Sequence, residues 1–131
     1  MPKRLHRLLL VVSALIFAFS AWLHTSAFGK AQSALEAVAL PPFYAHSFAG
    51  LWLIDSATLL SLAIVFVVIA AHPALATRWV IVLLALIPAS TSALIFVFVG
   101  SFPPPYILGF AALLAVLGGL GYPGTRVSAP L

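Results

Sequence analysis

Apolar residues dominate long stretches of this chain, and the few formal charges separate these stretches. No Asp, Glu, Lys or Arg occurs in residues 8–29, 56–77 or 79–125. A helix that crosses the hydrocarbon core of a bilayer needs about 20 predominantly apolar residues. The first two stretches are therefore long enough for one crossing each, and the third is long enough for two.

The third stretch contains an interruption, because residues 101–105 read Ser-Phe-Pro-Pro-Pro. Consecutive prolines cannot continue a helix, since each lacks an N–H and disfavours helical geometry in the preceding residue. We therefore predict a single all-α membrane domain, an up-down bundle of four transmembrane helices. The predicted spans cover residues 8–28, 46–71, 77–99 and 106–122.

A mixed segment between the first two predicted spans, residues 30–40, is too short to cross a membrane. Its apolar residues recur at roughly helical spacing, opposite polar residues that include Lys30 and Glu36. This pattern predicts a short amphipathic helix that lies at the membrane interface. We expect Pro41 and Pro42 to end this helix.

Composition supports a membrane protein and argues against several other classes. Of the 131 residues, 64% are apolar and 6% are charged, and the mean hydropathy is +1.23. Soluble domains carry about 25% charged residues, so this chain could not cover a globule with a wetted surface. The sequence pI is about 10.2, but the basic residues are scattered, so nucleic-acid binding is not expected. The absence of cysteine excludes disulfides and thiolate metal sites.

The positions of Lys and Arg predict the orientation of the spans. With four spans, both termini and the loop between the second and third spans share one side, which holds every Lys and Arg except Lys30. The positive-inside rule then places both termini in the cytoplasm, and we expect a bacterial inner membrane. The basic start followed by an apolar run also resembles a signal peptide. Because the run is longer than a typical signal core, we expect a retained first span.

Asp55 is the one acidic residue inside a predicted span, and such a carboxylate costs about 2.5–3.5 kcal/mol at a helix centre. At about 100° per residue, Thr58 lies on the same stripe of the helix as Asp55, and Ser56 points the other way. With a rise of about 1.5 Å per residue, His24 and three hydroxyl residues of the third span fall at comparable depths in the outer half of the bundle. The predicted polar site comprises Asp55, His24, Thr58, Ser90, Thr91 and Ser92.

Two roles are open for this predicted site. Asp55 could accept a proton or bind a cation, paired with His24. Alternatively, a protonated Asp55 could hydrogen-bond to neighbouring hydroxyl groups and fix the packing of the helices. His24 and His46 face the outer side and could ligate a metal or a haem, since imidazole is the commonest metal ligand. Neither has a second His at i+4, a carboxylate triad or a thiolate beside it, so no cofactor is predicted.

Small residues recur at every fourth position of the fourth predicted span, at Ala111, Ala115 and Gly119, with Gly118 beside them. Such residues let helices approach closely, either inside the chain or against a partner subunit. The three tryptophans lie near predicted helix ends, as anchors at the membrane interface do. These tryptophans are Trp22, Trp52 and Trp79.

Two short motifs in the first half of the chain resemble a known group of proteins. His24-Thr25-x-x-Phe28-Gly29 follows the first span, and Leu51-Trp52-x-x-x-Ser56 lies in the second. This arrangement is similar to that of small, uncharacterised four-helix membrane proteins of bacteria. The resemblance implies the four-helix topology and no known activity. Leu53 stands where that group often has His after the Trp. This departure argues against a shared metal-binding or catalytic role.

The sequence contains no phosphate-binding glycine loop, nucleophile elbow or zinc-protease motif. The leading hypothesis is therefore non-enzymatic: a structural or accessory subunit that packs in the lipid bilayer against itself or against a larger membrane complex. The alternative is a ligand-binding or transport unit for a cation, a proton-coupled substrate or a lipid. That unit would use the polar cluster around Asp55 and His24.

Overall fold

The computed structural model describes residues 3–121. Tyr122, the end of the fourth predicted span, and Arg126, which contributed to the predicted orientation, lie outside the described residues. The described chain is all-α, with four helices long and apolar enough to cross a membrane. The prediction of an all-α fold with four such helices is confirmed. The elements are α1 (Lys3–Ser26), α2 (Phe28–Ala37), α3 (Pro42–Ala71), the short 3-10 helix η1 (Pro73–Leu75), α4 (Arg78–Phe98) and α5 (Pro103–Leu120).

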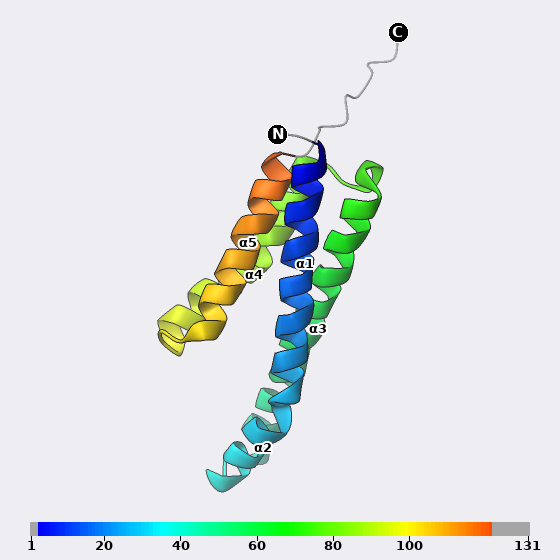
Figure 1. The fold of residues 1–131 in the computed structure, drawn as a ribbon. Helices are drawn as coiled ribbons and strands as arrows, with labels where there is room; N and C mark the ends of the chain where they lie inside the picture. Colours follow the sequence, from blue (N-terminus) through cyan, green and yellow to red (C-terminus); the bar gives the residue numbers. More distant parts are fainter. Residues whose placement is uncertain (1–2, 122–131) are drawn as a thin grey trace.

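The helices form two antiparallel pairs, and α1 lies between α3 and α5 (Figure 1). α4 packs on α5 and makes little contact with α3. The order in space is therefore α3, α1, α5, α4. The two pairs lie close together at the end where α1 begins, which we call the terminal end. They diverge toward the turn between α4 and α5 (Figure 1).

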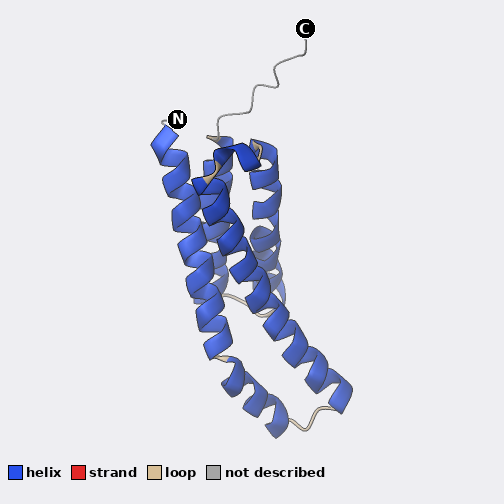
Figure 2. Cartoon of the chain, turned by 90° about the vertical axis from the view of Figure 1, so that its right-hand side faces the viewer, coloured by secondary structure: helices blue, strands red, loops and turns tan. Residues whose placement is uncertain are grey.

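α2 is a short helix between the first two long helices, as the sequence predicts, but its direction differs from the expected one. It continues roughly along α1 and runs beside the first part of α3 (Figure 2). The prolines after it start the next helix, because a proline in the first turn removes an N–H that has no helical partner there. α3 accordingly begins at Pro42 rather than at residue 46.

The triple proline forms the first turn of α5, whereas the sequence analysis placed it before the helix. The first N–H groups of a helix have no partner within it, so residues 103–105 remove donors that would otherwise be unsatisfied. The actual break lies at residues 99–102, where Gly100 has a φ of 104° in the left-handed region. α5 therefore begins at Pro103 rather than at residue 106.

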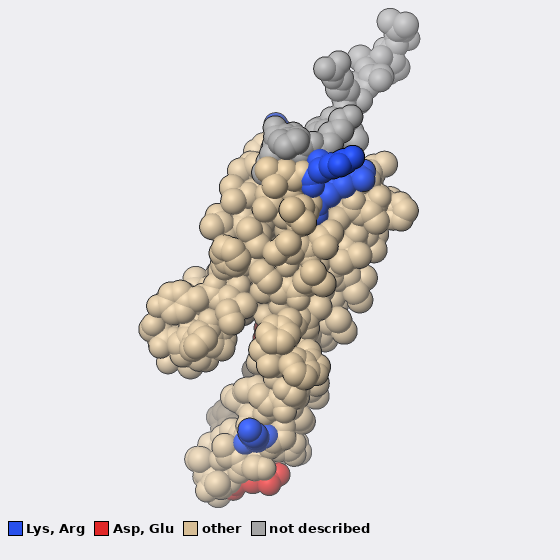
Figure 3. Space-filling view, viewed as in Figure 1, with Lys and Arg blue, Asp and Glu red and all other residues tan. Residues whose placement is uncertain are grey.

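The Lys and Arg side chains lie near the two ends of the molecule (Figure 3), whereas Asp55 lies within α3. Lys and Arg gather at the terminal end, where the guanidinium of Arg78 lies 5.1 Å from the centre of the Trp79 ring. A second charged patch lies at the far end, which we define as the turn between α2 and α3. α2 carries Lys30 and Glu36 there.

The core lies along both sides of α1. On the α3 side, Phe17 stacks on Phe66 with the ring centroids 5.9 Å apart, and both side chains are fully buried. On the α5 side, the buried Ser13 Oγ donates a hydrogen bond to the Ala111 carbonyl oxygen at 2.8 Å. The bond ties α1 to α5 and satisfies a hydroxyl that would otherwise be costly to bury.

The small residues of α5 lie in contacts within the chain. A Cβ added at Gly119 would lie 2.9 Å from Ile81 Cγ2 of α4, and one added at Gly118 would lie 3.0 Å from Leu10 Cδ2 of α1. α5 can approach both neighbours because these positions carry no side chain. The buried small residues of α5 are Ala111, Ala112, Ala115, Gly118 and Gly119.

We predict that Gly119→Ala lowers the free energy of unfolding by about 1–3 kcal/mol, the usual cost of overpacking. The added methyl group would force α4 and α5 apart at Ile81. Unfolding in detergent micelles measures the change. Gly50→Ala is the control, because nothing lies within 4 Å of its added Cβ and alanine favours a helix by up to about 1 kcal/mol. Equal stabilities of the two variants would contradict the prediction.

Candidate functional site

The last turn of α1 meets α3 in an aromatic and polar cluster. The His24 ring stacks on the Trp52 ring with the centroids 4.2 Å apart and an interplanar angle of 12°. Trp52 Nε1 donates a hydrogen bond to the carbonyl oxygen of His24 at 2.8 Å. The indole therefore holds both the backbone and the side chain of His24.

Three residues of α3 surround the imidazole because they lie at positions i, i+3 and i+4 of one helix face. Besides Trp52, these are Asp55 and Ser56. His24 Nδ1 is hydrogen-bonded to Ser56 Oγ at 2.9 Å, and His24 Nε2 lies 3.7 Å from Asp55 Oδ2. Both ring nitrogens thus face polar atoms of α3, which fixes the orientation of the ring.

The His24–Asp55 pair is accessible from outside the helix pair. The side chains of His24 and Asp55 are 28% and 32% exposed. Toward the terminal end, the α1–α3 interface continues with the buried apolar residues Ala21, Leu59 and Phe17. Nε2 and the carboxylate belong to partly exposed side chains and are therefore the polar atoms that the cluster offers to a ligand.

The structure does not bring the other predicted residues to this pair. Thr58 Oγ1 donates to the Ile54 carbonyl oxygen of its own helix at 2.9 Å. Ser90 and Thr91 both donate to the Ile87 carbonyl oxygen of α4, at 2.9 and 3.0 Å. The hydroxyl groups of α4 stay apart from the site because α4 packs on α5 and scarcely touches α3.

Ser92 has a different position from its two neighbours. Its buried Oγ donates to the Pro105 carbonyl oxygen at 2.7 Å. A Cβ added at Gly109 would lie 3.0 Å from the same Oγ. Ser92 is therefore part of the α4–α5 contact, where its hydroxyl connects the two helices.

Sequence reasoning missed Ser56 and favoured the role of an interface anchor for Trp52. Ser56 faces the imidazole, contrary to the expectation that it points away from the site. On a helical wheel, Asp55 and Ser56 are separated by about 100°. The imidazole ring of His24 nevertheless lies beside both side chains. The i, i+4 spacing of Trp52 and Ser56 was the signal that the sequence contained. In the structure, Ser56 Oγ also donates to the Trp52 carbonyl oxygen at 3.3 Å.

His46 lies in another environment. It lines a pocket of about 300 Å³ between α2 and α3, together with Gln32 and Glu36. Among residues 3–121, no three His, Cys, Asp or Glu side chains group in a way that could hold a metal ion. The two histidines weighed as metal ligands thus have different surroundings, His24 beside Trp52 and His46 beside α2.

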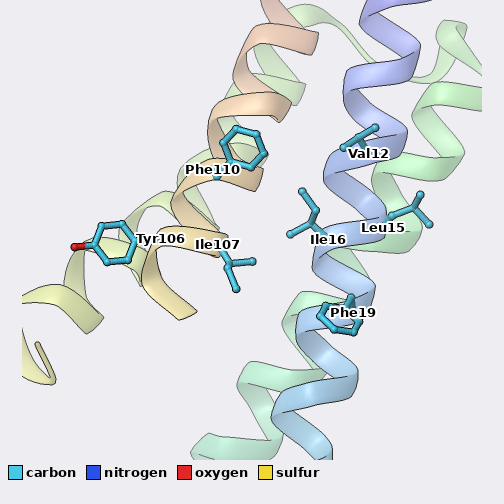
Figure 4. A pocket seen from close by; sticks show the side chains of 7 residues that line it. All are labelled: Val12, Leu15, Ile16, Phe19, Tyr106, Ile107 and Phe110. Atoms are coloured by element: carbon cyan, nitrogen blue, oxygen red, sulfur yellow. The ribbon is translucent and has the colours of Figure 1, made fainter. Parts of the chain in front are cut away.

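An apolar groove of about 550 Å³ lies between α1 and α5 where the helix pairs diverge (Figure 4). Its lining contains one polar side-chain group, the hydroxyl of Tyr106. That hydroxyl forms a hydrogen bond with Ser101 Oγ at 2.8 Å. The lining residues are Val12, Leu15, Ile16, Phe19, Tyr106, Ile107 and Phe110.

No model of a known protein family matches the chain, and no curated protein and no solved structure matches it. The resemblance to small bacterial four-helix membrane proteins therefore stays a prediction.

We predict that Trp52→Phe lowers the free energy of unfolding by about 0.5–1.5 kcal/mol, the usual contribution of one hydrogen bond. Phenylalanine can keep the stack on His24 but has no N–H to donate to the His24 carbonyl oxygen. Unfolding in micelles measures the loss. Trp22→Phe is the control, because Trp22 is 63% exposed and its ring lies beside Phe19. An equal loss in the control would rule out a specific effect of the Trp52 bond.

Proposed function

We propose that the protein is a small multi-pass membrane protein that acts as a structural or accessory subunit, packed against a second copy or a larger membrane complex. Four helices of sufficient length and hydropathy support the membrane setting. The distribution of Lys and Arg supports cytoplasmic termini in a bacterial inner membrane. The observation that carries the proposal is a set of hydroxyl groups on the outward sides of α3 and α4.

These hydroxyl groups are suited to contact with another helix. Ser61 of α3 and Ser90 of α4 are exposed, and Thr58 and Thr91 are partly exposed. Each donates to a carbonyl oxygen of its own helix, which leaves its oxygen able to accept a further bond. Lipid tails offer no donor, whereas polar side chains of a partner helix do. The proposal therefore places the partner on these sides.

The hydroxyl groups of the two helices also match in depth. Thr58 lies roughly 20 Å from the end of α3, and Ser90 lies roughly 18 Å from the start of α4, at about 1.5 Å per residue. These two helix ends adjoin at the terminal end of the molecule, joined through η1. A partner that contacts both helices would therefore meet both groups at one level of the membrane.

Native mass spectrometry of the protein, purified in mild detergent from its own host, tests this proposal. We expect a homo-oligomer or a larger complex. The double variant Ser90→Ala/Thr91→Ala should lose about 1 kcal/mol of association free energy, which is roughly a five-fold rise in Kd. Ser101→Ala is the control, since Ser101 lies in the turn between α4 and α5 and is not one of these outward hydroxyl groups. A wild-type protein that stays monomeric in bilayers would refute the assignment.

A second candidate function rests on the His24–Asp55 pair. Nε2 and Oδ2 lie 3.7 Å apart, so one donor between them can reach both atoms. A protonated amine supplies such a donor together with a charge opposite to that of a carboxylate. This second proposal is a ligand-binding unit for a small cation or an amine-bearing lipid head group.

We predict that Asp55→Asn weakens the binding of methylammonium by about 1.5–3 kcal/mol, which is tenfold or more in Kd. Asparagine keeps the shape of the side chain and removes its charge. NMR titration of the His24 ring in micelles measures the binding. Glu36→Gln is the control, since it removes the acidic group of α2 and leaves Asp55 in place. Unchanged binding in Asp55→Asn would contradict this second proposal. If the wild type binds no methylammonium and Asp55→Asn fails to fold, the His24–Asp55 pair has a packing role only.

A further inference from the structure

The turn between α4 and α5 is apolar and strongly exposed. Val97, Phe98 and Val99 are 75%, 81% and 69% exposed. The sequence has no formal charge in residues 79–125, on either side of this turn. The far end of the molecule differs, because α2 carries charged residues beside its turn (Figure 3).

The same turn has few free backbone donors. The N–H groups of Val99 and Gly100 both bond to the Ile95 carbonyl oxygen, at 2.9 and 3.0 Å. Residues 103–105 are prolines and have no N–H. The Ser101 hydroxyl is hydrogen-bonded within the chain. An unsatisfied donor is costly in hydrocarbon, so these bonds and prolines lower the cost of placing the turn in an apolar medium.

Helix lengths place this turn short of the far end. α3 has 30 residues and α4 has 21, which correspond to about 45 and about 31 Å. Both helices are measured from the terminal end, where η1 joins them (Figure 1). The hydrocarbon core of a bilayer is about 30 Å thick. The α2–α3 turn therefore extends beyond such a core, whereas the α4–α5 turn lies at its limit.

We propose that the α4–α5 turn is embedded in lipid, so that acyl chains rather than water cover residues 97–102. The groove between α1 and α5 adjoins this turn through Tyr106, which lines the groove and is bonded to Ser101 (Figure 4). The apolar lining of the groove accepts an acyl chain of the same lipid. This inference rests on the membrane setting of the proposed function.

Site-directed spin labelling tests the inference directly, because the chain has no native cysteine. Val99→Cys places a nitroxide on the turn, Leu86→Cys places one at the exposed middle of α4, and Ser33→Cys places one on α2. The full chain is reconstituted in vesicles of phosphatidylethanolamine and phosphatidylglycerol. Power-saturation EPR then compares collisions with oxygen, which concentrates in hydrocarbon, and with a water-soluble nickel chelate. Phe98→Cys repeats the measurement at a second position of the turn.

We expect nitroxides at residues 99 and 86 to collide with oxygen and not with the nickel chelate. The nitroxide at residue 33 should collide with the nickel chelate and little with oxygen. Nickel access at 99 together with oxygen access at 86 would overturn this inference but not the membrane setting, since the helices would be inserted in the bilayer and the turn would be exposed to water. Loss of both collision effects at 99 would also overturn it, because protein would then cover the turn. Nickel access at 86 would instead remove the membrane setting of the proposed function.

Discussion

The two-sided packing of α1 is the interaction on which the rest of the structure depends. Phe17 and Phe66 join α1 to α3, and the Ser13 bond to the Ala111 carbonyl oxygen joins α1 to α5. α4 reaches the remaining helices almost entirely through α5. A helix that packs closely against two neighbours needs small or well-fitted side chains on both faces. α1 and α5 do this with Ser13, Ala111 and Gly118.

The number of long helices could be predicted because a span must be continuously apolar whatever it packs against. The residues at which the helices begin were harder to predict, because proline has two structural roles. It ends a helix from within, and it is favoured in a first turn. Pro42 and Pro103 have the second role, and the pattern of the surrounding residues does not distinguish the two.

The candidate site was only partly predictable for a related reason. His24 and Asp55 stand out as polar residues in apolar helices, and their depths along the helices were enough to place them together. Depth does not say which helices are neighbours. The prediction therefore added Ser90 and Thr91 from α4, which packs on α5 instead. It also overlooked Ser56, because the contact depends on the angle at which His24 approaches α3.

The bond between Ser13 and Ala111 constrains the order in which contacts can form during synthesis of the chain. The two residues are 98 positions apart, and synthesis at about 5–20 residues per second separates their appearance by roughly 5–20 seconds. During that interval α1 can pair with α3, while the α5-facing side of α1, with its hydroxyl, has no counterpart from its own chain. The second hairpin, formed by α4 and α5, can pack against α1 only after translation has produced it. The contact between α1 and α5 therefore cannot form before nearly the whole chain has been synthesised.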